Sequence, residues 1–358
     1  MQQGFVTASL AIWLDLIRVL AALTVLLGHA VQLGLYTGPF PFTIALQQNA
    51  VIVFFVLSGL LVAGSAERAG GLGRYVIARA SRIVPVALAA IVVSLAVAAL
   101  DVMTSAEALY PEHKNWRDKA ALLGAVFFLS ESWAPYFALN PPFWSLCYEV
   151  WFYALFGAAL FTRGLWQIAW LAVLGLVAGP NVLLLLPCWL LGVWLHRVNP
   201  QVPRHLARPA IMVGLAGLAI APHLAEPGQK LLMSIATWDL GHALYAPSYL
   251  FLALCVTIGL AGLRTLTISG WSVPAPLCVP VRRLADISFS LYILHWPLLK
   301  LSRMMGVAPG TNFLSFLAVL ALTIGASAVF AWCTEARRPA LRAWLENRRD
   351  GAAALSAH

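Results

Sequence analysis

The stretch Leu14-Asp-Leu-Ile-Arg-Val-Leu-Ala-Ala-Leu-Thr-Val-Leu-Leu-Gly-His29 places a carboxylate, a guanidinium and an imidazole in a segment otherwise apolar enough to cross a bilayer. At about 100° per residue, Asp15, Arg18 and His29 share one helix face, with about 16 Å between Arg18 and His29 along the axis. An ionisable group inside a membrane helix costs roughly 2.5–3.5 kcal/mol on insertion scales and usually faces the bundle interior, so we interpret this stripe as a candidate functional site. Alternatively, Asp15 and Arg18 pair at the cytoplasmic interface and His29 lies at the opposite one.

The rest of the chain has the composition of a membrane protein. Of 358 residues, 61% are hydrophobic and 10% are charged, against roughly 25% charged in soluble domains. The net charge of +9 is distributed as arginine clusters between apolar stretches, as the positive-inside rule predicts, and does not indicate nucleic-acid binding. The five cysteines lack metal-ligand spacing, so we interpret them as small hydrophobic residues and expect no metal site.

Eleven apolar windows follow one another along the chain, near residues 9–33, 43–65, 83–103, 119–135, 143–162, 164–179, 181–196, 209–225, 243–263, 286–307 and 313–333. The window 119–135 has about half of the roughly 20 uncharged residues that a span needs, and we assign it to a short helix in an external segment, residues 104–142. The ten other windows predict an all-α, polytopic membrane helix bundle with every arginine cluster and both termini in the cytoplasm.

Two boundaries follow from this assignment. The short windows 164–179 and 181–196 are joined by Gly179-Pro180-Asn181 and are expected to form a hairpin of two thin spans. The membrane domain is expected to cover residues 1–346. Residues 347–358 are expected to form a short, disordered cytoplasmic tail.

A second polar pair lies at the start of the window 143–162. Ser145 and Glu149 are four residues apart, so they share a helix face, among aromatic side chains that include Trp144. A glutamate with few solvent partners needs a polar partner across the bundle. Glu149 is therefore predicted to donate a proton or to orient an imidazole, at a depth comparable to that of His29. The alternative is a structural network between helices.

Three further features have both a functional and a structural interpretation. His295 is a second histidine in an apolar window and serves in either binding or packing. Ser58 and Gly59 are small, which permits close approach of a helix or of a ligand chain. Arg79 and Arg82 lie one turn apart and can present two guanidiniums to a phosphate, although positive-inside anchoring explains them equally well.

In combination, these residues resemble the integral-membrane acyltransferase family 3, typified by bacterial O-acetyltransferases of cell-surface glycans. The resemblance covers nearly the whole chain. It rests on short motifs in a fixed order: Leu14-Asp15-x-x-Arg18 followed by ten residues and His29; Phe54-Phe55-Val-Leu-Ser58-Gly59; Arg79-x-x-Arg82-Ile83-x-Pro85; Trp144-Ser145-Leu146-x-x-Glu149-x-x-Phe152-Tyr153; Ser290-Leu291-Tyr292-x-Leu294-His295-x-Pro297; and Glu335 with a basic cluster.

The resemblance implies transfer of an acyl group, by default acetyl, from cytoplasmic acyl-coenzyme A to a hydroxyl of a glycan or similar acceptor outside a bacterial inner membrane. It implies His29 as general base, or as the carrier of a transient acyl group, with Glu149 to orient or assist it. Arg18 would stabilise developing charge or hold the pantetheine end of the donor, and Asp15 is counted with these three among the expected catalytic residues. Arg79 and Arg82 would hold the phosphates of coenzyme A. Further substrate contacts are expected from Ser58, Trp144, Ser145, Tyr292 and His295.

No permanently bound cofactor is expected beside the acyl-coenzyme A donor, the hydroxyl acceptor and the bilayer. A rival interpretation is a transporter or flippase of a lipid-linked glycan or small anion, which would use the same buried charges as a translocation path. Acyl transfer by the purified protein distinguishes the two.

Overall fold

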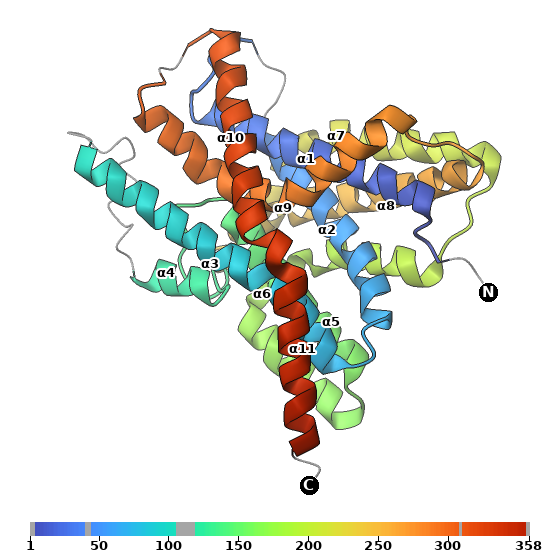
Figure 1. The fold of residues 1–358 in the computed structure, drawn as a ribbon. Helices are drawn as coiled ribbons and strands as arrows, with labels where there is room; N and C mark the ends of the chain where they lie inside the picture. Colours follow the sequence, from blue (N-terminus) through green and yellow to red (C-terminus); the bar gives the residue numbers. More distant parts are fainter. Residues whose placement is uncertain (1–3, 40–43, 105–118, 308–309, 356–358) are drawn as a thin grey trace.

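In the computed structural model, residues 4–39, 44–104, 119–307 and 310–355 are described, and this part of the chain is helical without a β-strand (Figure 1). The α-helices and two 3-10 helices run in the order α1 (Ala8–Gln32), α2 (Ile44–Glu67), α3 (Leu72–Thr104), α4 (Lys119–Val126), α5 (Phe143–Phe161), α6 (Gly164–Val198), α7 (Arg204–Met233), η2 (Gly241–Tyr245), α8 (Ala246–Ile268), α9 (Ala275–Met304), α10 (Phe313–Cys333), η3 (Glu335–Arg337) and α11 (Arg338–Leu355).

Eight helical segments in the described part of the chain are long and apolar enough to cross a membrane. They contain α1, α2, α3, α5, α6, α7, α8 and α10, whereas α9, which carries Asp286 and Lys300, is not among them. The expected all-α membrane bundle is therefore confirmed. The window 119–135 contains only the eight-residue helix α4, as its charges predicted.

Helix α6 is interrupted where the sequence predicted a hairpin. Gly179 has φ 82° and ψ 166°, which are not helical values. The Cδ1 atom of Leu183 lies 3.9 Å from the position that a β-carbon on Gly175 would occupy. Residues eight apart in a straight helix are separated by about 12 Å along the axis, so the chain must bend back sharply at Gly179.

Two elements differ from the expectation. Helix α3 begins at Leu72, eleven residues before the window 83–103, so Arg79 and Arg82 lie in the same continuous helix as this window. Helix α11 continues through Leu355, where a disordered tail was expected from residue 347, and the end of the chain beyond Leu355 lies outside the described residues. Ion pairs within and beside α11, such as Arg342 with Glu346 at 2.9 Å, favour the helical form.

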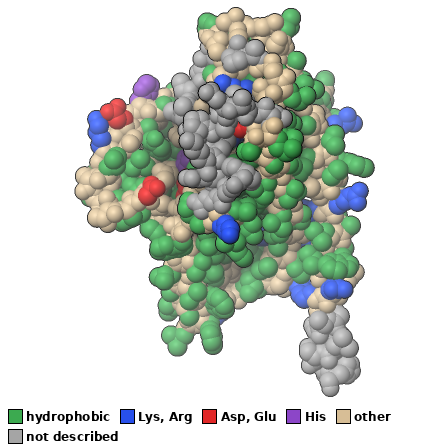
Figure 2. All heavy atoms as spheres, turned by 90° about the vertical axis from the view of Figure 1, so that its left-hand side faces the viewer, with side chains coloured by type: hydrophobic (Ala, Val, Ile, Leu, Met, Phe, Trp, Pro, Cys, Tyr) green, Lys and Arg blue, Asp and Glu red, His purple; other side chains and the backbone are tan. Residues whose placement is uncertain are grey.

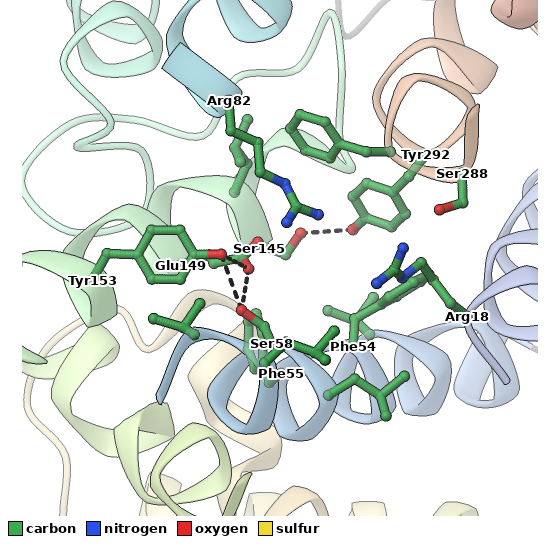
Figure 3. Close-up of a pocket in the computed structure, with 16 residues that line it drawn as sticks. Arg18, Phe54, Phe55, Ser58, Arg82, Ser145, Glu149, Tyr153, Ser288 and Tyr292 are labelled. Atoms are coloured by element: carbon green, nitrogen blue, oxygen red, sulfur yellow. Dashed lines mark hydrogen bonds between the residues drawn. The ribbon is translucent and has the colours of Figure 1, made fainter. Parts of the chain in front are cut away.

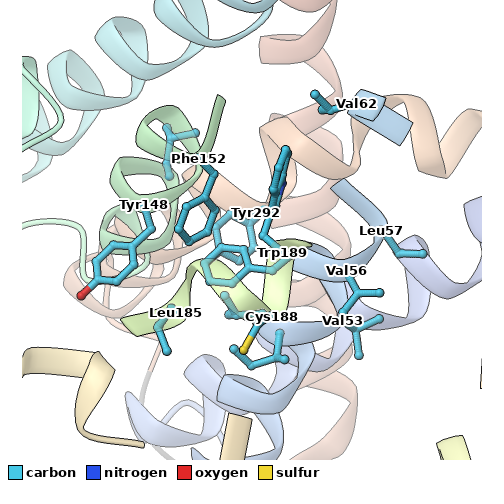
Figure 4. Packing of buried hydrophobic residues seen from close by; sticks show 14 of the residues in the cluster. Val53, Val56, Leu57, Val62, Tyr148, Phe152, Leu185, Cys188, Trp189 and Tyr292 are labelled. Carbon is cyan, nitrogen blue, oxygen red and sulfur yellow. The ribbon is translucent and has the colours of Figure 1, made fainter. Parts of the chain in front are cut away.

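Helices α2 and α6 approach each other closely, as the small Ser58-Gly59 pair predicted. A β-carbon on Gly59 would lie 2.1 Å from the carbonyl oxygen of Trp189, and one on Gly192 would lie 2.0 Å from that of Val56. The indole of Trp189 is fully buried among side chains of α2, α5 and α6 (Figure 4). This contact fixes Ser58, the neighbour of Gly59, against α5 and α6.

The outside of the bundle is strongly apolar. On the face shown in Figure 2, hydrophobic side chains form a broad continuous area, with lysine and arginine side chains mainly at its margins. Leu165, Met103 and Leu314 are 84%, 81% and 77% exposed. Such a surface is stable against lipid rather than water, which agrees with the candidate spans.

Candidate active site

Two adjoining cavities lie in the centre of the bundle, and we call them the inner and the outer chamber. The inner chamber has a volume of about 80 Å³ and is lined by Arg18, Val51, Phe54, Phe55, Leu57, Ser58, Leu61, Val62, Arg82, Ser145, Leu146, Glu149, Tyr153, Ser288, Phe289 and Tyr292 (Figure 3). The outer chamber has a volume of about 330 Å³ and is lined by His29, Gln32, Leu33, Gln47, Gln48, Val51, Tyr136, Ala138, Pro141, Pro142, Trp144, His242, Tyr292, Trp296 and Lys300. Val51 and Tyr292 line both.

A carboxylate is held on one side of the inner chamber. The Oε1 atom of Glu149 accepts short hydrogen bonds from the hydroxyls of Ser58 and Tyr153. Trp189 donates its indole N–H to Ser58 Oγ at 3.2 Å, which fixes the direction in which this hydroxyl donates. The close α2–α6 contact at Gly59 therefore builds the cradle that orients Glu149.

Two guanidiniums face this carboxylate. Arg18 from α1 and Arg82 from α3 point toward the centre of the inner chamber from different sides (Figure 3). Arg18 is within electrostatic reach of Arg82, Glu149 and Glu335. Glu335 accepts hydrogen bonds from the backbone N–H and the hydroxyl of Ser290. The lining of the chamber thus carries two guanidiniums and one carboxylate, and Asp15 and Glu335 are further carboxylates within reach of Arg18.

The two chambers meet at a pair of hydroxyls. Ser145 Oγ and the hydroxyl of Tyr292 lie 2.7 Å apart, and both also lie 3.2 Å from the carbonyl oxygen of Pro142. The Tyr292 ring packs edge-on against Phe54, with 5.6 Å between ring centroids. Because Tyr292 borders both cavities, this pair lies at the boundary between the two chambers.

Two histidines are paired beside the outer chamber. The Nδ1 atom of His29 lies 2.8 Å from Nε2 of His295, and the two rings are stacked. The Nδ1 atom of His295 lies 3.2 Å from the carbonyl oxygen of Leu291, which can only accept. His295 therefore carries its proton on Nδ1 and accepts one from His29 Nδ1, since a neutral imidazole has one donor and one acceptor nitrogen. This leaves the Nε2 lone pair of His29 available as a base.

A third imidazole, which the sequence analysis missed, lines the same chamber. His242 Nδ1 lies 2.6 Å from Oε1 of Glu131, and the ring stacks on Trp144 with 4.2 Å between centroids. Glu131 belongs to the segment after α4 and His242 to η2, far apart in the sequence. Glu131 lies in the window 119–135, which the sequence assigned to an external segment, and His242 lies one residue before the window 243–263, so a search for charge inside spans did not select them.

The structure brings together part of the predicted site and separates another part. Glu149 faces Ser58 and Tyr153 in the inner chamber, so the expectation that it orients His29 is wrong: His295 is the partner of His29. Ser145 and Glu149 lie one turn apart on α5, so the carboxylate of Glu149 is offset along the helix from the Ser145–Tyr292 pair.

Three predicted residues lie outside both chambers. Asp15 forms an ion pair with Arg18, with 3.9 Å between Asp15 Oδ1 and Arg18 Nη1, but lines neither cavity. The Arg79 guanidinium lies over the Tyr153 ring, 5.7 Å from its centroid, in a separate pocket. The Arg79 Nε atom is buried and has no hydrogen-bond partner among the described residues. Of the residues expected to contact substrate, those that line the chambers are Arg82, Ser58, Ser145, Trp144 and Tyr292. His295 lines neither chamber and contacts His29.

Comparison with known proteins identifies a family. A family profile described as an acyltransferase domain matches residues 11–332, which is nearly the whole chain. No curated protein and no solved structure matches. The matched range contains every residue that lines the two chambers.

Proposed function

The chain belongs to the acyltransferase domain family and is a membrane acyltransferase, and from this premise we propose that it moves an acyl group, by default acetyl, from acyl-coenzyme A to a hydroxyl of a glycan or similar acceptor. The observation that carries the proposal is the contact between the two chambers. One presents guanidiniums and a carboxylate, the other presents imidazoles, and both border Tyr292.

The chamber sizes support this division of roles. Ligand pockets usually measure roughly 300–1,000 Å³, so the inner chamber, at about 80 Å³, is too small for a nucleotide but suits a narrow chain such as the pantetheine end of a donor. The outer chamber, at about 330 Å³, can admit a compact acceptor. In this proposal the thioester lies near the Ser145–Tyr292 pair, where the chambers meet.

The reaction then follows from the tautomer of His29. His29 Nε2 removes the proton of the acceptor hydroxyl as its oxygen attacks the thioester carbonyl carbon. The carbon–sulfur bond breaks, the proton passes from His29 to the leaving thiolate, and the products are an ester and free coenzyme A. Hydroxyl donors near the carbonyl, such as Tyr292, and the positive charge of Arg18 would stabilise the oxyanion. An acyl-histidine on His29 is an alternative route to the same products.

The direct test uses the purified protein in detergent or proteoliposomes with acetyl-coenzyme A. We expect release of free coenzyme A thiol that increases when a hydroxyl acceptor is added, with the acetyl group recovered as an ester. Flux of a glycan or a small anion across the proteoliposome membrane without thiol release would contradict the proposal and favour a transporter.

We further propose ten spans, with both termini cytoplasmic and the protein in a bacterial inner membrane. The bend at Gly179 divides α6 into two short spans, and α9 adds one more to the eight candidates. All arginine clusters then lie on the inner side. The inner chamber faces the cytoplasm, where acyl-coenzyme A is found.

The topology can be tested with two exposed serines, Ser234 at the end of α7 and Ser269 at the end of α8. In a cysteine-free background, Ser234→Cys is expected to react with a membrane-impermeant thiol reagent added outside intact cells, and Ser269→Cys is expected to react only after the cells are opened. The substitutions are nearly isosteric and both sites are exposed, so accessibility of the side chain is matched. Labelling of both serines from the same side would contradict the proposed path of α8 across the membrane.

The donor site can be tested at Arg82. Replacing Arg82 by alanine removes a charge-assisted contact between its guanidinium and the bound donor, worth about 1.5–3 kcal/mol. This predicts an increase of about ten- to a hundredfold in the donor KM with kcat largely kept. Arg82→Lys should restore only part of the affinity, because an ammonium cannot form the bidentate contact. The matched control is Arg283→Ala, an exposed arginine of α9 that lines neither chamber. Equal effects of both substitutions on the donor KM would indicate that Arg82 only anchors its helix at the cytoplasmic side of the membrane.

A further inference from the structure

The Glu131–His242 pair has the geometry of a built acid–base pair. The backbone N–H of His242 donates to Glu131 Oε2 at 3.1 Å, while His242 Nδ1 lies 2.6 Å from Oε1. The carboxylate thus engages both the backbone and the ring of one residue. The Glu131 side chain is only 6% exposed, against 23% for His242, so the imidazole is the half of the pair that meets the cavity.

A second layer of contacts holds this pair in place. The amide N–H₂ of Asn181 donates to the carbonyl oxygens of Glu131 and Asp239 at 2.8 and 2.9 Å, and the indole of Trp238 donates to Asn181 Oδ1 at 3.0 Å. Gly241 has φ 48°, and a β-carbon there would lie 2.8 Å from Glu131 Oε2. A side chain at residue 241 would therefore displace the carboxylate.

These contacts decide which nitrogen of His242 is available. A carboxylate accepts, so His242 Nδ1 carries a proton and the second nitrogen, Nε2, is left for a ligand. Stacking on Trp144, with 7° between the ring planes, fixes the orientation of the imidazole. Glu131 does not line the outer chamber, whereas His242 does, so the edge away from Glu131 is the one presented to the chamber.

We infer that His242 Nε2 binds a second hydroxyl of the acceptor while His29 takes the proton of the reacting one. His242 is close enough to His29 for an electrostatic interaction between them, and both line the outer chamber. The inference rests on the proposed function and adds a requirement to it: the acceptor carries at least two hydroxyls. Amides of Gln32, Gln47 and Gln48 and the rings of Trp144 and Trp296 supply the mixed polar and aromatic lining that a polyhydroxylated ligand needs.

The test compares two alcohols with the same ring. Methyl glucoside carries several hydroxyls, and tetrahydropyran-2-methanol carries one primary hydroxyl on the same type of ring. The wild-type protein is expected to transfer acetyl from acetyl-coenzyme A to methyl glucoside with the higher kcat/KM. His242→Ala should lower kcat/KM for methyl glucoside about tenfold and leave that for tetrahydropyran-2-methanol nearly unchanged.

Glu131→Gln provides the second variant, because it keeps the size of the side chain but no longer fixes the tautomer of His242. Glu131→Gln should also lower kcat/KM for methyl glucoside. The double variant should lose little more of this kcat/KM than either single variant. The matched control is His196→Ala. His196 Nε2 pairs with Glu67 Oε2 at 2.9 Å, but neither residue lines a chamber, so the preference for methyl glucoside should stay as in the wild type.

Three outcomes would overturn the inference. They are no preference for methyl glucoside in the wild type, an unchanged preference in His242→Ala at full activity, and an unchanged preference in His242→Ala with an equal loss for both alcohols, which indicates that the pair only stabilises the fold. A wild-type protein that releases no thiol under any condition contradicts the proposed function itself.

Discussion

Replacing His29 by alanine is expected to lower kcat for acyl transfer by about 10²- to 10⁴-fold, the usual contribution of a general base. The expectation follows from the hydrogen-bond chain, because His295 and the carbonyl oxygen of Leu291 leave the lone pair of His29 on Nε2. The measurement is thiol release at saturating acetyl-coenzyme A and acceptor. Since Arg18 and Arg82 line the other chamber, the donor KM should change little.

Two variants make the His29 result specific. His196→Ala removes an imidazole that also pairs with a carboxylate but lies outside both chambers, and it should keep full activity. His295→Gln can still accept a hydrogen bond from His29 Nδ1, so it should lose much less activity than His29→Ala. A His29→Ala protein that is folded and keeps more than about a tenth of the wild-type kcat would show that another group removes the proton.

The fold was largely predictable because apolar length and charge carry most of the information in a membrane helix. The windows 9–33, 43–65, 143–162 and 313–333 lie within two residues of the observed ends of α1, α2, α5 and α10. The prediction was poorer where apolar character does not set the helix end. Helix α3 begins eleven residues before its window 83–103, because the polar turn that carries Arg79 and Arg82 is helical as well.

Several residues of the candidate site could be selected from the sequence, but the contacts between them could not be predicted. Asp15, Arg18 and His29 were selected because charge inside a span is costly, and Arg18 and His29 do line chambers. Matching depth along two helices did not decide which side chains meet, since this depends on how the helices are rotated against each other. His29 therefore meets His295 of α9, and Glu149 meets Ser58 of α2.

The second large effect is expected at Glu149. Glu149→Gln keeps the shape of the side chain but removes the carboxylate that balances Arg18 and Arg82 and accepts from both Ser58 and Tyr153. Removing one partner from a buried charge network costs about 3–5 kcal/mol, which corresponds to roughly 10²- to 10³-fold. We therefore expect a loss of this size in the equilibrium between the folded and the unfolded protein, measured as a lower midpoint of thermal unfolding in the absence of acyl-coenzyme A.

The neighbours of Glu149 provide a graded comparison. Ser58→Ala and Tyr153→Phe each remove one hydrogen bond to the carboxylate, worth about 1.5–3 kcal/mol, and leave the charge and the other hydroxyl in place. Each should therefore cost less than Glu149→Gln. A Glu149→Gln protein that is as active and as stable as the wild type would show that Glu149 neither contributes to acyl transfer nor balances the charge of Arg18 and Arg82.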